Sequence, residues 1–335
     1  MDRETLAEIV GGNCVWEREP ISRHTTFQIG GEAEYFVAPD TVETLVELVN
    51  VLRDRGEPYF LMGNGSNLLV SDRGYPGVLI TTHMAGKSYG DIPGKMGLCQ
   101  ISFLDSEEQK RQVAPKYLRI DSGEIAELEE KTLVRAGAGT MLSVLSNAVA
   151  KKGLAGFAFA SGIPGTLGGA VTMNAGAYGG EIRDCILGAM LLMPDGTQAF
   201  RGREELELGY RTSIVQREGC IVLWALFAFS PGNTEEILAQ MRELNGRRRE
   251  KQPLEYGSAG STFKRPEGYF AGKLIEDAGL KGYRKGDVMV SEKHCGFVVN
   301  VGNGTYEDAM GVITHVQETV KEKFGVALEL EVKLL

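Results

Sequence analysis

Apolar residues recur at the spacing of an amphipathic helix in three parts of the chain, and capping or stop residues bound these patterns. In the first, Asp40 and Glu43 have the spacing of a capping box and Gly56 ends the apolar stripe. In the last, Thr305 and Asp308 form the same motif. With a further helix starting at Thr234, the expected helices cover 40–56, 141–152, 234–245 and 306–324. The inner stripe of the last helix is expected to be Met310, Ile313, Val316, Val320 and Phe324.

Short apolar runs bounded by turn residues predict strands between these helices. The runs lie at 59–62, 68–70, 78–80, 133–137, 186–193 and 221–229. Every second residue of the C-terminal segment 326–334 is apolar, so a strand there would place Glu329, Glu331 and Lys333 together on the opposite face. The alternation of strands and helices predicts compact α/β units.

Length and charge distribution suggest how these units are organised. A chain of 335 residues exceeds what one hydrophobic core uses, so two or three domains are expected. Pro253 follows a cluster of charges and is a plausible domain boundary. Between Asp105 and Lys131, 13 of 27 residues are charged, which predicts an exposed excursion. The net charge of −9 argues against binding to nucleic acid or to an anionic membrane over the whole surface.

Cysteine and histidine usage narrows the class of protein further. The five cysteines are scattered and form no C-x-x-C motif, which is typical of reduced thiols in a cytosol. The four histidines have no metal-ligand spacing with them, so no metal site is predicted. The apolar run Cys220 to Phe229 has ten residues, about half the ~20 that a membrane helix needs. With no signal-like N-terminus, a cytoplasmic protein without membrane insertion is expected.

Two glycine-rich segments are the strongest candidates for ligand binding. Neither a P-loop nor a Rossmann fingerprint is present, because Thr81 and Leu68 stand where glycines are needed. The loop 63–67 can direct successive backbone N–H groups at an anion. The longer segment 161–180 can bring its backbone close to a large ligand. Tight turns and close strand packing explain each segment equally well when it is considered alone. Taken together, the two glycine-rich segments favour a dinucleotide as the bound ligand.

Six separated motifs, in order along most of the chain, resemble the UDP-N-acetylenolpyruvoylglucosamine reductase (MurB) family. They are HTTFQIGGEAEYF at 24–36, MGNGSNLLV at 62–70, SGIPGTLGGAVTMNAGAYGGEI at 161–182, YRTSIVQ at 210–216, KQPLEYGSAGSTFKRPEGYFAGKLIEDAGLKG at 251–282 and GVALELEV at 325–332. Six motifs are far more specific than any one of them. The short span from Arg211 to Ser261 leaves no equivalent of the segment that carries a tyrosine lid in one branch, so the chain resembles the other branch.

The resemblance implies an α+β protein with an FAD-binding fold of two α/β subdomains (PCMH/VAO type) and a C-terminal substrate-binding α+β domain. Applied to this chain, the subdomains are 1–83 and 84–250, with a charged insertion at about 86–130. The substrate-binding domain is 251–335, and its last strand returns toward the flavin site. A monomer with non-covalent FAD is expected.

The implied reaction is the NADPH-dependent reduction of the enolpyruvyl ether of UDP-N-acetylglucosamine to UDP-N-acetylmuramate, a peptidoglycan precursor. Hydride passes from NADPH to flavin N5 and then to substrate C3. By motif position, Arg211 and Glu331 stabilise the enolate and Ser261 protonates C2, with Lys264 a local source of charge for that hydroxyl. Two alternatives stay open, a flavin oxidase of the same fold and a non-catalytic nucleotide-sugar binding protein.

Binding residues follow from the same motifs. Those implied for FAD are Gly63, Asn64, Gly65, Ser66, Asn67, Ser161, Gly162, Ile163, Pro164, Gly165, Gly168, Gly169, Asn174, Ala175 and Gly176. Those implied for the substrate are Tyr178, Lys251 and Lys264.

Overall fold

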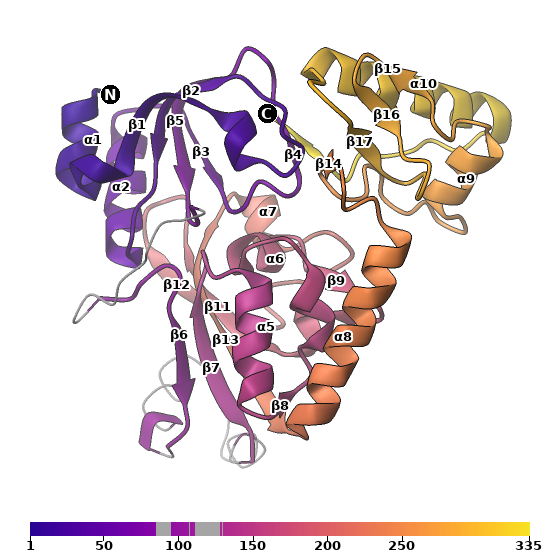
Figure 1. Ribbon diagram of the computed structural model, residues 1–335. Helices are drawn as coiled ribbons and strands as arrows, with labels where there is room; N and C mark the ends of the chain where they lie inside the picture. The colour runs from indigo at the N-terminus through magenta and orange to yellow at the C-terminus, as the bar shows by residue number, and fades with distance from the viewer. Residues whose placement is uncertain (85–94, 107, 111–127, 129) are drawn as a thin grey trace.

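The computed structural model describes residues 1–84, 95–106, 108–110, 128 and 130–335. Its elements gather around three larger sheets of four, six and four strands, which follow one another along the chain (Figure 1). The first sheet uses residues up to Thr81, the second lies between Ile101 and Pro231, and the third begins at Gly257.

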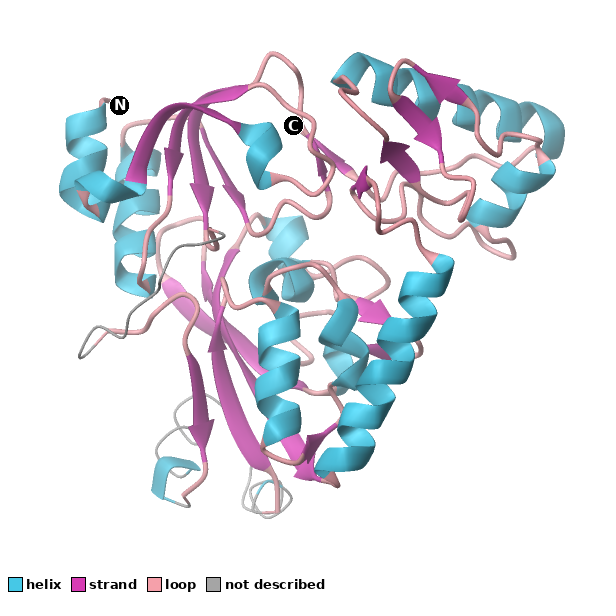
Figure 2. Ribbon diagram, viewed as in Figure 1, coloured by secondary structure: helices cyan, strands magenta, loops and turns pink. Residues whose placement is uncertain are grey.

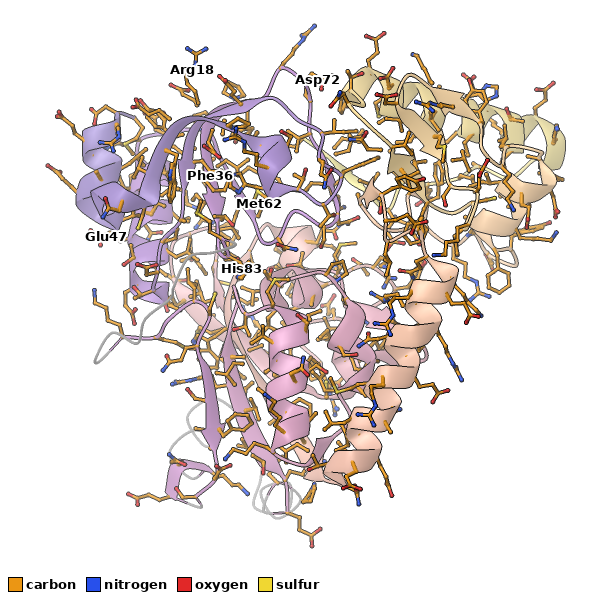
Figure 3. All side chains as sticks on the ribbon, viewed as in Figure 1. Arg18, Phe36, Glu47, Met62, Asp72 and His83 are labelled. Carbon is orange, nitrogen blue, oxygen red and sulfur yellow. The ribbon has the colours of Figure 1, made fainter. Side chains whose placement is uncertain are left out.

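The first sheet has the strand order β1-β2-β5-β3 and mixes parallel and antiparallel pairs. Neighbouring residues of one strand face opposite sides, so Val37 packs under helices α1 and α2 while Phe36 joins Met62 in a cluster on the other face (Figure 3). These elements are α1 (Arg3–Val10), β1 (Val15–Pro20), β2 (Glu32–Val37), α2 (Val42–Asp54), β3 (Tyr59–Met62), β4 (Leu68–Leu69) and β5 (Tyr75–Thr81).

The second sheet is antiparallel, in the order β12-β11-β13-β7-β6, with the short β8 attached to β13. Figure 2 shows its long strands with helices beside them. Phe157, Phe227 and Phe229 pack together in its core. The elements are β6 (Ile101–Leu104), β7 (Thr132–Gly137), α5 (Leu142–Lys151), β8 (Leu154–Ala155), α6 (Leu167–Thr172), β9 (Gly176–Ala177), β10 (Gly180–Glu181), β11 (Ile186–Leu192), β12 (Gln198–Gly202), α7 (Ile214–Glu218), β13 (Ile221–Pro231) and α8 (Thr234–Lys251).

The third sheet has the order β14-β17-β16-β15 and packs against helices α9 and α10. After α10, Leu328 and Val332 still pack in the core of this unit, and the last strand, β18, pairs in parallel with β4 beside the first sheet (Figure 1). The elements are β14 (Gly257–Ser258), α9 (Ala271–Asp277), β15 (Arg284–Lys285), β16 (Val288–Val290), β17 (Val298–Asn300), α10 (Tyr306–Phe324) and β18 (Lys333–Leu334).

The predicted helices are confirmed, with corrections at their ends. Helix α10 has the predicted capping box at Thr305 and Asp308, but the cap of α2 is Thr41, whose hydroxyl accepts from the Thr44 N–H, and not Asp40. Helix α8 runs six residues beyond Asn245, because the charged residues that follow continue it to Lys251. In the α10 stripe, Met310 is only partly buried and Phe324 is 39% exposed, while Ala309 and Val312 are buried.

The C-terminal segment 326–334 and the charged segment 86–130 differ more from the predicted structure than the helices do. Residues 326–334 do not form one continuous strand: Leu330 makes an isolated bridge to Phe263, and only Lys333–Leu334 belong to a ladder. Ile101–Leu104 lie inside the predicted insertion 86–130, but they form a strand that pairs with β7 in the second sheet. Most of the charged run lies outside the described residues. Among the residues that are described, no helix has the length and apolar character needed to cross a membrane.

Candidate active site

A cavity of about 1460 Å³ opens where segments from all three sheet units meet. Its wall includes the loop after β3, the segment that follows α5, the residues after α8 and the C-terminal segment near Glu331. Pockets for single drug-sized ligands have volumes of about 300–1,000 Å³. The cavity therefore has room for a dinucleotide together with a second ligand.

Both predicted glycine loops line this cavity, and they are joined directly. The Asn64 side-chain amide donates to the Pro164 carbonyl across 2.8 Å. The predicted FAD residues in the wall are Gly63, Asn64, Gly65, Ser66, Asn67, Gly162, Ile163, Pro164, Gly165, Gly168, Gly169, Ala175 and Gly176.

The glycines of these loops serve two different purposes. A Cβ on Gly63 would lie 2.0 Å from Thr166 Oγ1, and one on Gly65, where φ is +59°, would lie 2.3 Å from the His24 carbonyl oxygen, so the chain's own packing requires them. A Cβ on Gly169 would meet no protein atom closer than 3.8 Å. Gly169 therefore leaves backbone open to the cavity, which fits close approach of a large planar or phosphate-bearing group such as FAD.

Arg211 and Glu331 form an ion pair at the cavity wall. Arg211 Nε donates to Glu331 Oε1 across 2.5 Å, and the side chains are 23% and 13% exposed. Arg211 has φ of +56°, a left-handed conformation that costs a non-glycine residue roughly 1 kcal/mol. The turn that imposes it is held to the end of α6, since Ser213 Oγ donates to the Thr172 carbonyl and Asn174 Nδ2 to the Gly209 carbonyl.

The two candidate glutamates of the C-terminal segment have different environments. Burial raises the pKa of Glu331, and the positive charges of Arg211 and Lys264 only partly offset this. Glu329 is 74% exposed and pairs with Lys264 at 3.1 Å. Of the two glutamates, Glu331 lines the cavity and Glu329 does not.

Ser261 lines the cavity on a loop that is fixed through its neighbour, Thr262. The buried Thr262 hydroxyl accepts from the Val298 N–H, and its own N–H donates to the Gly296 carbonyl. The Thr262 carbonyl accepts from the Glu331 N–H at 2.9 Å. Through this last bond the serine loop and the partly buried Glu331 are held together.

Three predicted binding residues do not line the cavity. Ser161 Oγ donates to Asn245 Oδ1, and Lys264 Nζ is engaged with Glu329. Asn174 is 1% exposed and bonds to backbone at both ends of its amide. Their side chains shape the surroundings of the cavity and do not face it.

The two other predicted substrate residues, Tyr178 and Lys251, do line the cavity. So does Arg248, to which the sequence analysis gave no role. Because α8 continues to Lys251, Arg248 and Lys251 lie three residues apart and share a helix face. An Arg-x-x-Lys spacing in a longer helix was the signal available in the sequence.

Gln28 was also missed. It has φ of +58° and lines the same wall, although the sequence analysis gave its motif no role.

Comparisons with known proteins agree with this geometry. Residues 252–335 match the family model for the UDP-N-acetylenolpyruvoylglucosamine reductase C-terminal domain, and residues 118–199 match an FAD binding domain model. The UDP-N-acetylenolpyruvoylglucosamine reductase of Lachnoclostridium phytofermentans is 47% identical, covering 99% of this chain and 96% of that protein. The one from Agathobacter rectalis is 48% identical, covering 95% and 92%.

Among solved structures, the crystal structure of UDP-N-acetylenolpyruvylglucosamine reductase (MurB) from Thermus caldophilus matches with a TM-score of 0.69 and 32% identity. The match covers 96% of this chain and 97% of that one. The predicted α+β fold with an FAD-binding domain is thereby confirmed. At this identity and coverage, the chain belongs to the UDP-N-acetylenolpyruvoylglucosamine reductase family.

Proposed function

We propose that the chain catalyses the NADPH-dependent reduction of the enolpyruvyl ether of UDP-N-acetylglucosamine to UDP-N-acetylmuramate, with non-covalent FAD, for peptidoglycan precursor synthesis. Family membership supports the reaction and its cofactor. The observation that carries the proposal is the convergence of Arg211, Ser261 and Glu331 on one cavity that two glycine loops also line. These three residues come from distant parts of the sequence.

The roles of the residues follow from charge and geometry. FAD, when bound along the glycine loops, supplies hydride transfer from NADPH to the substrate. Hydride addition at C3 of the enolpyruvyl group leaves negative charge that spreads from C2 into the carboxylate. Arg211 is permanently charged and can donate to that carboxylate, while its bond to Glu331 fixes the direction of the guanidinium. Ser261 then supplies the proton to C2.

Substrate contacts are proposed from the rest of the wall. Lys251, one turn from Arg248, is a suitable partner for the UDP diphosphate, and Tyr178 stands at the same cavity. We assign Lys264 to holding Glu329 and not to the substrate, because its ion pair lies outside the cavity wall.

The organisation of the whole protein is proposed on the same basis. The domain borders near 83/84 and 250/251 agree with the order of the three sheets along the chain. We further propose a cytoplasmic monomer, as expected for an enzyme that uses NADPH and a soluble nucleotide sugar.

The test is the visible absorption spectrum of the purified protein without oxygen. A flavin spectrum that bleaches with NADPH and returns when UDP-N-acetylglucosamine enolpyruvate is added supports the proposal. Fast return with air and none with the nucleotide would make the protein a flavin oxidase. A flavin that NADPH does not bleach would leave a nucleotide-sugar binding protein, and a protein that takes up no FAD would overturn the cofactor assignment.

A further inference from the structure

The end of the chain is bonded to the first glycine loop by a run of hydrogen bonds. The C-terminal strand β18 lies beside β4, so residues at the extreme end reach the loop after β3 (Figure 1). The bonds are Asn67 Nδ2 to the Glu331 carbonyl (3.1 Å), Lys333 N–H to the Asn67 carbonyl (3.0 Å), Leu335 N–H to the Leu69 carbonyl (3.0 Å) and Ser71 N–H to the Leu335 carbonyl (2.6 Å).

Asn67 occupies the centre of this contact. Its side chain donates to one residue of the C-terminal segment and its carbonyl accepts from another, two positions further on. Asn64, three residues earlier in the same loop, instead donates to Pro164 in the second glycine loop. The two asparagines therefore hold the loop to different partners.

The backbone of Glu331 is consequently fixed on both sides. Its carbonyl accepts from Asn67, and its N–H donates to the Thr262 carbonyl next to Ser261. With both backbone groups held, the carboxylate is directed to Arg211 Nε at 2.5 Å. Removing the Asn67 side chain would release the carbonyl of Glu331 and keep the bond between the Glu331 N–H and the Thr262 carbonyl.

We propose that Asn67 is a positioning residue for Glu331, and that it couples the order of the glycine loop to the placement of the partly buried carboxyl group. The inference rests on the proposed function. A displacement of about 1 Å of a catalytic group can slow a reaction about 100-fold. The loss of the Asn67 side chain is therefore expected to slow substrate reduction by about 10- to 100-fold, a larger effect than on flavin reduction by NADPH.

The test compares three alanine variants of the full-length holoenzyme. Asn67→Ala removes the anchor of Glu331. Asn64→Ala removes the loop-to-loop bond. Gln317→Ala is the matched control, because the Gln317 amide donates to the Leu328 carbonyl of the same C-terminal segment at 2.8 Å, away from the glycine loop.

The readouts separate positioning from folding and from cofactor binding. FAD affinity, measured by flavin fluorescence, is expected to fall less in Asn67→Ala than in Asn64→Ala, and the half-reactions of all variants are compared at saturating FAD. Hydrogen exchange at Glu331 N–H, which needs no turnover, is expected to quicken in Asn67→Ala and not in Gln317→Ala, because only Asn67→Ala removes the side-chain donor to the Glu331 carbonyl. Anaerobic stopped-flow absorbance then gives the two half-reactions separately.

The pH profile of substrate reduction supplies the readout that a structural role would not change. Arg211 and Lys264 are the charged groups that act on Glu331, and both stay in place in all three variants. Because burial raises the pKa of Glu331, a carboxyl group released toward water should titrate at lower pH. The inflection should shift to lower pH in Asn67→Ala alone.

An Asn67→Ala enzyme with normal substrate reduction and an unshifted profile would overturn the positioning role, as would loss of FAD equal to that of Asn64→Ala. A shift of the pH inflection in Gln317→Ala equal to that in Asn67→Ala would also overturn the positioning role of Asn67. Failure of the proposed function is recognised separately, since the wild-type protein would then not return to its oxidised spectrum with the enolpyruvyl nucleotide.

Discussion

Replacing Arg211 by lysine tests whether the guanidinium stabilises the negative charge that develops on the substrate in the proposed reaction. Lysine keeps the positive charge but loses the planar guanidinium and the Nε–H that bonds to Glu331 at 2.5 Å. A hydrogen bond to a charged group is worth about 1.5–3 kcal/mol. If the guanidinium makes an equivalent bond to the substrate carboxylate as charge develops there, its loss raises the barrier by that amount. Each ~1.4 kcal/mol is a factor of ten, so the rate constant for substrate reduction should fall by about 10- to 100-fold.

The assay is anaerobic stopped flow at the flavin absorbance, with each half-reaction measured alone. Flavin reduction by NADPH does not develop charge on the substrate carboxylate, so it should change by less than about threefold. The control is Arg217→Lys, because Arg217 also pairs with a glutamate, Glu207, at a more exposed site on the surface. Equal slowing of both half-reactions, or an unchanged rate of substrate reduction, would refute the role of Arg211.

Further predictions test the other residues of the site. Ser261→Ala should retain flavin reduction by NADPH and block substrate reduction in stopped flow, whereas equal slowing of both would contradict a proton donor. Thr262→Val should lower the unfolding free energy in urea by about 1–3 kcal/mol, because Val298 N–H loses its acceptor, while Thr262→Ser should restore it. Gly169→Ala should weaken FAD binding at least about tenfold by fluorescence titration without lowering the melting temperature, because alanine favours the helix and the added methyl meets only the cavity. In Glu331→Gln the pH inflection of substrate reduction, expected above the usual ~4.3 of a glutamate because burial raises its pKa, should vanish.

Local patterns predicted those elements whose hydrogen bonds join residues close in sequence. The capping box of α10, with Thr305 and Asp308 only three residues apart, was readable directly. The full extent of α8 was not predicted, because Gly246, a weak helix former, follows Asn245, although the charged residues after it continue the helix to Lys251. The glycine loops were found from composition, but composition did not separate glycines needed for packing, such as Gly63, from those that open backbone to a ligand, such as Gly169.

The sequence by itself determined the family, the reaction class it implies, the predicted helices apart from their exact ends, and the candidate residue types. Only the tertiary structure decided which glutamate of the C-terminal segment lines the cavity, since Arg211 and Glu331 are 120 residues apart. The same holds for the bond between Asn67 and Glu331, which spans 264 residues. Burial and long-range hydrogen bonds depend on the arrangement of all three sheet units, and no periodicity within one segment encodes that arrangement.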